Sequence, residues 1–297
     1  MKRLILAYNP VSGNASFVNK LDFVIGSFAK RKMMILPYRT TKDNSDFADF
    51  VKGADAVGII AAGGDGTLNG IVNAMMRENI KLPLGIIGSG TSNDFATYLG
   101  LSVPFRDNDE TEQYFDRIAQ GITRVADLGK AGNKYFINVA SAGMMTSIAH
   151  KTEPRLKNAL GKFAYYWGGL KELPKFKSFA LNITADGKHY KTDAFLFVIV
   201  NSNVVGSLKN ISEQVKIDDG KLDLLAVKKT GAAELMKLAK DLFAGNSADG
   251  NDNVLHLAAK NFVVDTKEEL VGDLDGEKGS ALPLVVETVP QAIELFC

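Results

Sequence analysis

The sequence predicts an α/β domain with a parallel sheet, followed by a mainly antiparallel β-sandwich. Three observations support this fold class. Strand-like and helix-like segments alternate up to residue 125, strand-like segments predominate after Asp127, and three glycine-rich loops directly follow strands of the first part. A chain of 297 residues reaches the size at which single cores usually divide. We therefore expect one domain over residues 1–125, with residues 290–297 returning to it, and a second over residues 126–289.

Buried parallel strands are predicted at four apolar segments of the first part. These segments lack the polar alternation of a half-exposed strand, and helix-like segments separate them, as in a sheet covered on both faces. The strands are expected at residues 4–7, 33–37, 56–61 and 84–87, and the helices at residues 17–28, 43–52, 67–77 and 92–99. In the first helix, the predicted apolar face contains Phe17, Val18, Leu21, Val24, Ile25 and Phe28.

Strands predominate in the second part of the chain. They are expected at residues 135–140, 179–185, 188–200, 222–227, 262–266 and 284–288. Asp186-Gly187, between two of these segments, is typical of a two-residue hairpin turn. Helical insertions are expected near residues 155–172 and 231–243, and residues 292–296 are expected to return to the first domain.

Composition excludes several classes of protein. The chain has 35 Lys and Arg against 34 Asp and Glu, so it lacks the strong basic excess of a general nucleic-acid binder. The single cysteine, Cys297, excludes an internal disulfide and a cysteine-rich zinc site, and three scattered histidines argue against a histidine metal triad. The longest apolar run, residues 194–200, is far shorter than the roughly 20 residues of a membrane span. We expect a cytoplasmic protein.

Charge and aromatic residues indicate a contact with a membrane surface. Residues 1–42 and 150–177 have an excess of Lys and Arg, whereas residues 241–277 are acidic. The second basic segment contains Gly-Lys-Phe-Ala-Tyr-Tyr-Trp at residues 161–167, and amphipathic aromatics beside lysine suit a membrane interface. Two alternatives stay open: the charged segments are solvated faces, and the aromatic side chains pack on the sandwich.

Three glycine-rich loops predict a phosphate site. Because the strands before them are parallel, all three loops should lie at the carboxyl edge of one sheet, where glycine lets backbone N–H groups approach a phosphate. A hairpin turn is the alternative for Gly64-Asp65-Gly66, and a plain turn is the alternative for residues 9–13 taken alone. Neither a P-loop motif nor a dinucleotide-binding glycine motif occurs. The candidate loop residues are Asn9, Pro10, Val11, Ser12 and Gly13; Gly63, Gly64, Asp65, Gly66, Thr67, Leu68 and Asn69; and Gly90, Thr91 and Asp94.

These loop sequences resemble the diacylglycerol kinase catalytic-domain superfamily, and most of all its soluble bacterial type. The motifs are Asn-Pro-Val-Ser-Gly at 9–13, Gly-Gly-Asp-Gly-Thr-Leu-Asn at 63–69 and Gly-Thr-Ser-Asn-Asp at 90–94, with further matches at 125–129, 163–166, 216–221 and 274–277. The resemblance implies a phosphofructokinase- and NAD-kinase-like nucleotide domain and a β-sandwich lipid domain. It also implies ATP as phosphoryl donor and a lipid hydroxyl as acceptor, with diacylglycerol giving phosphatidic acid as the expected reaction.

Three carboxylates are the catalytic candidates. Asp65 lies in the phosphate loop, where its charge would repel ATP unless a Mg²⁺ ion lies between them. The resemblance implies that Glu277 is the general base and that Asp127 belongs to the water network around the metal, and it matches Thr40 and Thr91 to nucleotide contacts. From chemistry alone, Glu277 could be a solvated turn acid and Asp127 a strand-end cap.

A second Mg²⁺ ion and the partners follow from the resemblance. The family holds a structural ion at a turn that here would use the Asp219 carboxylate and the carbonyls of Lys216 and Lys221, whereas the residues alone indicate a plain hairpin turn. The expected partner is a lipid at an anionic bilayer surface to which the protein binds peripherally, with no nucleic acid; a homodimer is left open. The alternative functions are an NAD kinase and a non-catalytic, nucleotide-gated membrane binder.

Overall fold

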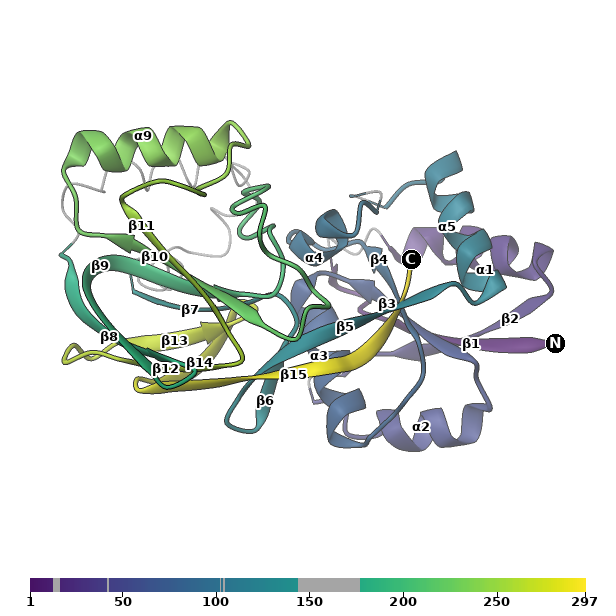
Figure 1. Ribbon diagram of the computed structural model, residues 1–297. Helices are drawn as coiled ribbons and strands as arrows, with labels where there is room; N and C mark the ends of the chain where they lie inside the picture. Colours follow the sequence, from purple (N-terminus) through teal and green to yellow (C-terminus); the bar gives the residue numbers. More distant parts are fainter. Residues whose placement is uncertain (13–16, 42, 102, 104, 144–176) are drawn as a thin grey trace. The chain divides into compact units, whose positions relative to one another are not determined.

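The chain divides into two compact units. The computed structural model describes residues 1–297 except 13–16, 42, 102, 104 and 144–176 (Figure 1). The first unit contains residues 1–128 and 291–297, and the second contains residues 129–290. The sequence placed this boundary at 125/126 and the return at 290. Two strands, β5 (Thr123–Ala131) and β15 (Leu284–Phe296), belong partly to each unit.

The first unit is built on a parallel sheet, as predicted. Its strands are β1 (Lys2–Tyr8), β2 (Met33–Arg39), β3 (Gly58–Gly63) and β4 (Leu84–Gly88), in the order β2-β1-β3-β4. The end of β15 continues this sheet, because Leu295 pairs in parallel with Leu84. β3 and β4 are buried at every position, which explains why their sequences show no polar alternation.

Helices cover this sheet, and two differ from the prediction. They are η2 (Val18–Lys20), α1 (Leu21–Lys30), α2 (Phe47–Ala54), α3 (Asp65–Arg77), α4 (Asp94–Tyr98) and α5 (Asp109–Gln120). The predicted helix at 17–28 is a 3₁₀ turn followed by α1, and Val18 and Ile25 are 42% and 45% exposed rather than buried. Helix α5 was not predicted, although the Asn108 side chain caps its start and Gly121 (φ 76°) ends it.

Helix α5 is fixed against α1 by aromatic packing and an ion-pair cluster. The rings of Phe28 and Phe115 lie 4.6 Å apart between the two helices. Arg31 reaches from the end of α1 to Glu112 at 2.7 Å and Asp116 at 2.8 Å. These contacts hold α5 against α1, and the Tyr114 hydroxyl of α5 accepts the Ile86 N–H of β4 at 2.9 Å, which positions the cavity described below.

The second unit is an antiparallel β-sandwich, as predicted. Its elements are β6 (Lys134–Phe136), β7 (Val139–Gly143), β8 (Phe179–Ala185), β9 (Lys188–Val200), β10 (Leu222–Lys228), α9 (Ala232–Phe243), β11 (Val254–Ala259), β12 (Asn261–Asp265), β13 (Val271–Leu274) and β14 (Glu277–Ala281). The first half of β9 pairs with β8, and its second half pairs with β10 and β7. The expected helix near 155–172 lies outside the described residues.

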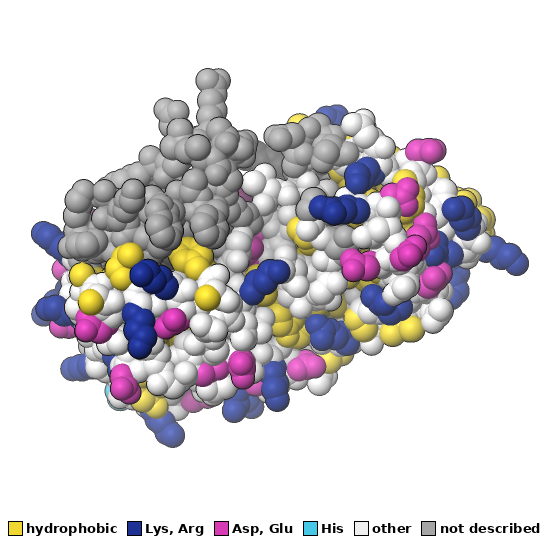
Figure 2. Space-filling model, turned by 90° about the horizontal axis from the view of Figure 1, so that it is seen from above, with side chains coloured by type: hydrophobic (Ala, Val, Ile, Leu, Met, Phe, Trp, Pro, Cys, Tyr) yellow, Lys and Arg dark blue, Asp and Glu magenta, His cyan; other side chains and the backbone are white. Residues whose placement is uncertain are grey.

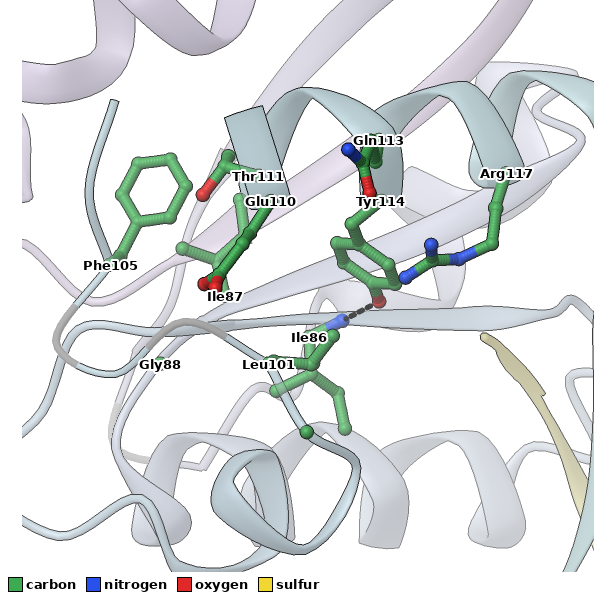
Figure 3. Close-up of a pocket in the computed structure, with 11 residues that line it drawn as sticks. Ile86, Ile87, Gly88, Leu101, Phe105, Glu110, Thr111, Gln113, Tyr114 and Arg117 are labelled. Atoms are coloured by element: carbon green, nitrogen blue, oxygen red, sulfur yellow. Dashed lines mark hydrogen bonds between the residues drawn. The ribbon is translucent and has the colours of Figure 1, made fainter. Parts of the chain in front are cut away.

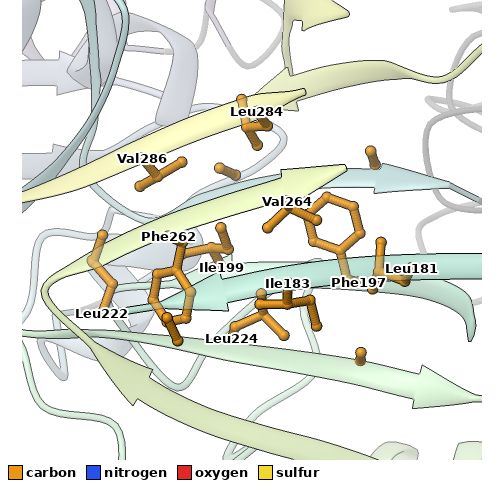
Figure 4. Close-up of a cluster of buried hydrophobic side chains, with 14 of the residues drawn as sticks. Leu181, Ile183, Phe197, Ile199, Leu222, Leu224, Phe262, Val264, Leu284 and Val286 are labelled. Carbon is orange, nitrogen blue, oxygen red and sulfur yellow. The ribbon is translucent and has the colours of Figure 1, made fainter. Parts of the chain in front are cut away.

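The sandwich core forms from alternate residues of these strands. In β8, Phe179, Leu181, Ile183 and Ala185 are buried while the residues between them are not, a period of two. Figure 4 shows Leu181, Ile183, Phe197 and Phe262 turned toward one interior. The hairpin between β8 and β9 has positive φ at Asp186 (46°) and Gly187 (81°), the conformation that an Asp-Gly turn favours.

One expected strand differs in detail, and four observed strands were not expected. The segment at 135–140 is interrupted at residues 137 and 138, where β6 ends and β7 has not begun. Strands β5, β11, β13 and β14 were not predicted. The short β13 and β14 contain glycine and charged residues, so they lack the apolar pattern on which the prediction depended.

Candidate functional site

The three glycine-rich loops meet at the carboxyl edge of the parallel sheet. They follow β1, β3 and β4, and backbone hydrogen bonds connect their starts. The Asn9 N–H donates to the Ala62 carbonyl at 3.1 Å, and the Ser89 N–H donates to the Gly63 carbonyl at 2.9 Å. The Asp65 N–H donates to the Ser92 carbonyl at 3.0 Å. From the sequence, the loops were expected to lie at one edge only because their strands are parallel, whereas the structure shows direct hydrogen bonds between them. Gly13, at the end of the first loop, lies outside the described residues.

The glycines of the second and third loops pack backbone against backbone. A Cβ atom added at Gly64 would lie 2.8 Å from the Ser92 carbonyl oxygen, and one added at Gly90 would lie 2.6 Å from the Gly64 nitrogen. Real Cβ atoms essentially never approach heavy atoms within 3.0 Å. Glycine is therefore required here for the two loops to touch, in addition to any role in approaching a phosphate.

The Asp65 carboxylate fastens the second loop to the start of α4. Its Oδ2 accepts the Asp94 N–H at 3.0 Å, and its Oδ1 accepts the Phe95 N–H at 3.5 Å. Unpaired N–H groups at a helix start carry partial positive charge, so a carboxylate is favoured there. This contact was not predicted, because its partners lie 29 and 30 residues away in the sequence. Asp65 therefore has a structural partner before any metal is considered.

Other members of the predicted nucleotide set also lie at this edge. Asn9 accepts the Val11 N–H on its Oδ1 at 3.1 Å and donates through Nδ2 to the Thr67 hydroxyl at 3.3 Å. Thr40, at the end of β2, donates its N–H to the Tyr8 carbonyl at 3.0 Å. Thr91 is exposed. The 13-residue helix α3 begins directly after Gly64, so its N-terminus is directed to the same edge.

Asp127 is completely buried within the first unit. Its Oδ1 accepts the Gln291 N–H at 2.7 Å, where β15 enters this unit. Gln291 has φ 48°, a conformation that non-glycine residues adopt at a cost, and a charge-assisted hydrogen bond helps to hold it. Asp127 thus stabilises an irregular point of β15, a role close to the strand-end cap that the sequence left open.

Glu277 opens β14 in the second unit and is exposed. It pairs with Leu274 across a two-residue turn in which Asp275 and Gly276 have φ of 51° and 89°. Such a turn projects the first side chain of β14 in a defined direction. The hydrogen bonds of Asp275 hold this turn and therefore the backbone from which the Glu277 side chain extends.

Asp275 is the residue that sequence reasoning missed. Its carboxylate is 7% exposed and accepts three backbone N–H groups, from Ile137 at 2.7 Å, Asn138 at 3.0 Å and Val139 at 2.8 Å. Ile137 and Asn138 form the break between β6 and β7, and Val139 is the first residue of β7. A carboxylate that accepts several backbone N–H groups is strongly anchored. The Asp-Gly pair before Glu277 indicated a turn, but nothing local could reveal a partner some 137 residues away.

The predicted structural-ion turn precedes β10. Gly220 has φ 74°, and the Asp219 carboxylate accepts the Lys221 N–H at 3.0 Å. The described residues between β9 and β10 contain no strand, so this is a turn into a strand and not the hairpin turn that the residues alone indicated. Over the described part of the chain, no group of three or more His, Cys, Asp or Glu side chains could hold a metal ion.

Two further sequence predictions concern membranes. The aromatic segment at 161–167 lies outside the described residues. Among the helices that the structure describes, none is long and apolar enough to cross a membrane.

Fold and site together define a two-domain kinase: an α/β unit with glycine-rich loops at the carboxyl edge of a parallel sheet, and a β-sandwich. Residues 3–131 match the diacylglycerol kinase catalytic domain, and residues 138–297 match the YegS C-terminal NAD kinase beta sandwich-like domain. The chain belongs to the diacylglycerol kinase family, and its catalytic domain is that of a kinase, a transferase. The soluble bacterial type that the loop motifs indicated is confirmed.

Named relatives agree with this assignment. The chain is 32% identical to a diacylglycerol kinase of Bacillus subtilis (strain 168) over 95% of this chain and 92% of the relative. It is also 32% identical to a diacylglycerol kinase of Staphylococcus aureus (strain bovine RF122 / ET3-1), over 99% and 92%. A crystal structure of a diacylglycerol kinase from Bacillus anthracis str. Sterne superposes with a TM-score of 0.80 and 26% identity, covering 99% of this chain and 96% of that one.

Proposed function

We propose that the protein transfers the γ-phosphoryl group of ATP to a lipid hydroxyl, with diacylglycerol as acceptor and phosphatidic acid as product. The observation that supports this most is the joined pair of glycine loops, in which Gly64 and Gly90 touch and Asp65 fastens one loop to the other. Loops joined in this way form a preorganised phosphate-binding edge, and positioning is most of what phosphoryl transfer requires of a protein.

Asp65 fits a Mg²⁺ ion bound together with ATP. One strong and one long amide contact, at 3.0 and 3.5 Å, leave acceptor capacity on a carboxylate that has about four lone-pair sites. Mg²⁺ usually uses one or two carboxylates plus phosphate oxygens and water, so no cluster of protein ligands is needed. The ion would neutralise charge on the phosphate oxygens, and we propose that the buried Asp127 orders water near it.

Glu277 is the proposed general base. Its exposed carboxylate extends from the start of β14, on a turn that Asp275 anchors, so it is accessible to an acceptor hydroxyl and its backbone position is fixed. A carboxylate in reach of that hydroxyl can accept its proton during transfer.

For the second unit we also propose a structural Mg²⁺ at the Asp219 carboxylate and the carbonyls of Lys216 and Lys221.

We propose peripheral binding to an anionic bilayer and no nucleic-acid partner. Figure 2 shows Lys and Arg interspersed with Asp and Glu on the described part of one face, without a single basic field. This distribution does not favour a general nucleic-acid surface. The proposed bilayer contact is supported by the sequence, in which residues 1–42 and 150–177 have an excess of Lys and Arg. A homodimer is compatible with this proposal but is not required by it.

The experiment is phosphorylation of a total bacterial lipid extract with radiolabelled ATP and Mg²⁺, followed by chromatography of the lipids. The labelled product should migrate with phosphatidic acid, and removal of Mg²⁺ should abolish labelling. Asp65→Asn should reduce labelling by on the order of 10² or more, as loss of one charge-stabilising group typically does.

The matched control is Asp55→Asn. Asp55 ends α2 with φ 48°, which asparagine also adopts readily, and its side chain is 95% exposed. This variant should keep its activity. Equal labelling by Asp65→Asn and Asp55→Asn would refute the metal assignment. Label on a nucleotide acceptor instead of a lipid would replace the proposal by the NAD kinase alternative.

A further inference from the structure

A cavity of about 200 Å³ lies between β4 and α5 in the first unit (Figure 3). Ile86 and Ile87 of β4 and Leu101 line one side, Phe105 closes one end, and α5 provides the other side. The three phosphate loops do not line it, except that Gly88, at the end of β4, is shared. None of the roles assigned above uses this cavity.

Arg117 places a positive charge at one end of the cavity, opposite the end at which Glu110 lies (Figure 3). Its side chain lines the cavity, and among the described residues it forms no ion pair; its Nε–H is buried without a hydrogen-bond partner. Its guanidinium lies 5.8 Å from the centre of the Tyr114 ring. The neighbouring acids Glu112 and Asp116 are both bound by Arg31. A cation left without a counterion in a partly buried site favours an anionic ligand.

The remaining walls set the shape of that ligand. The Tyr114 hydroxyl accepts the Ile86 N–H at 2.9 Å, and complete burial raises the pKa of Tyr114 above its usual value, so it stays neutral. The Thr111 hydroxyl donates to the Arg106 carbonyl at 2.7 Å. The Tyr114 oxygen is thus used as an acceptor and the Thr111 hydroxyl as a donor, while the Tyr114 O–H can still donate to a ligand. Ile86, Ile87, Leu101 and Phe105 make the rest of the lining largely apolar. Glu110 points into the cavity at the end away from Arg117 (Figure 3).

We propose that this cavity binds a small, flat organic carboxylate, with the carboxylate on Arg117 and the apolar body against Leu101 and Phe105. An apolar cavity of about 150 Å³ can bind benzene, so a volume of about 200 Å³ accepts a single ring. A hydroxyl or amine at the far end of the ring would donate to Glu110. Arginine is suited to this task because its planar fork matches a carboxylate in two places.

The site has a connection to the third phosphate loop. Its walls include residues on both sides of the segment 89–99, which contains that loop and α4: Gly88 before it, and Gly100 and Leu101 after it. The Phe105 N–H donates to the Gly88 carbonyl at 2.9 Å, and the Leu101 N–H donates to the Ala96 carbonyl at 3.0 Å. A ligand in the cavity therefore restrains both ends of the loop and should change nucleotide affinity. This coupling rests on the proposed function, whereas binding of the carboxylate does not.

The test is calorimetric titration of the full-length protein with benzoate and 4-hydroxybenzoate. Both should bind saturably, with 4-hydroxybenzoate tighter because it reaches Glu110, and uncharged benzamide should bind at least 10-fold more weakly than benzoate. Arg117→Met should weaken benzoate binding at least 10-fold. The matched control is Arg124→Met, because Arg124 also has a buried Nε–H without a partner and lies 5.9 Å from the Tyr98 ring, but does not line the cavity.

A second variant guards against a folding defect in Arg117→Met. Gln113 is exposed at the cavity mouth, and Gln113→Trp should block entry while leaving the core unchanged. The site is supported if the wild type binds benzoate saturably, if Gln113→Trp abolishes this binding, and if Arg124→Met changes the benzoate affinity by no more than about threefold. Absence of saturable binding to the wild type, or equal binding by wild type and Arg117→Met, overturns it. The coupling is overturned separately if saturating benzoate leaves the affinity for a non-hydrolysable ATP analogue unchanged.

Discussion

Replacing Gly90 by alanine tests whether the two phosphate loops depend on direct backbone contact. The added Cβ would lie 2.6 Å from the Gly64 nitrogen, inside the 3.0 Å limit of real Cβ contacts. The obstructing atom belongs to the backbone, so no side-chain rotation relieves the overlap, and the loops must separate by several tenths of an ångström. Overpacking of this kind costs about 1–3 kcal/mol. The free energy of unfolding of the first unit should fall by that amount.

The control makes the same chemical change in an open position. Gly26 lies within α1, and no heavy atom lies within 4 Å of a Cβ added there. Alanine is favoured over glycine in a helix by roughly 0.5–1 kcal/mol, so Gly26→Ala should stabilise the protein. The two glycine-to-alanine changes are therefore expected to differ in sign.

The assay must report on the first unit alone, because a chain with two units need not unfold in one transition. Hydrogen exchange measured by mass spectrometry on peptides from β3 and β4 does this, with urea unfolding as the global measure. Gly90→Ala should exchange faster in both peptides, including the one that contains Gly64. Unchanged exchange and stability in Gly90→Ala would show that the loops do not depend on this contact.

Three further predictions concern the second unit. Glu277→Gln should lower turnover by about 10²–10⁴ with little change in ATP affinity; retained turnover in steady-state kinetics would remove the base assignment. Asp275→Ala should destabilise the unit by roughly 3 kcal/mol or more in urea unfolding, since even one buried unsatisfied donor costs about 1–3 kcal/mol and three would lose their acceptor. The pKa of His256 is raised, first by its hydrogen bond to Asp223 at 2.7 Å and then by the nearby Asp249. The contribution of His256 to stability should be complete below its pKa of about 6.5 in the unfolded chain, and it should be lost as the pH rises through the raised pKa of the folded protein. His256→Asn should flatten that part of the dependence of unfolding free energy on pH.

Much of the fold could be predicted because it is encoded locally. The apolar segments of β1 to β4 and the Asp186-Gly187 turn each contain their own signal, and the structure has them within a few residues. Helix α5 also has local signals, the Asn108 cap and Gly121, but its first turn is entirely polar or acidic, so the apolar pattern begins late. The error at Val18 and Ile25 has a different origin. Periodicity shows which side chains share one face of a helix, but it does not show how much of that face the sheet buries.

The site could be predicted only as a set of residue types. Glycine and carboxylate motifs identified the loops and the acids, but the contacts that position them join residues far apart in sequence. Asp65 reaches amides 29 and 30 residues away, and Asp275 reaches amides up to 138 residues away. Such contacts depend on the three-dimensional course of the chain, so no local pattern contains them. Likewise, the sequence did not show that Gly64 and Gly90 pack against each other's backbone.

These positions share a property that decides which variants are informative. Asp65 and Asp127, both proposed to act near a metal, also accept backbone N–H groups, and Asp275 anchors the turn that presents Glu277. Alanine at any of these three aspartates removes a structural acceptor together with a charge, so lost activity would not separate the two effects. The amide isostere keeps one acceptor oxygen, removes the charge and replaces the other oxygen by an NH₂ donor. At Asp65, the oxygen of asparagine can still accept the Asp94 N–H, and the amide nitrogen falls beside the weaker contact to Phe95. A defect in Asp65→Asn that appears in phosphoryl transfer but not in unfolding would therefore be attributable to charge, which is the property that a Mg²⁺ ion requires.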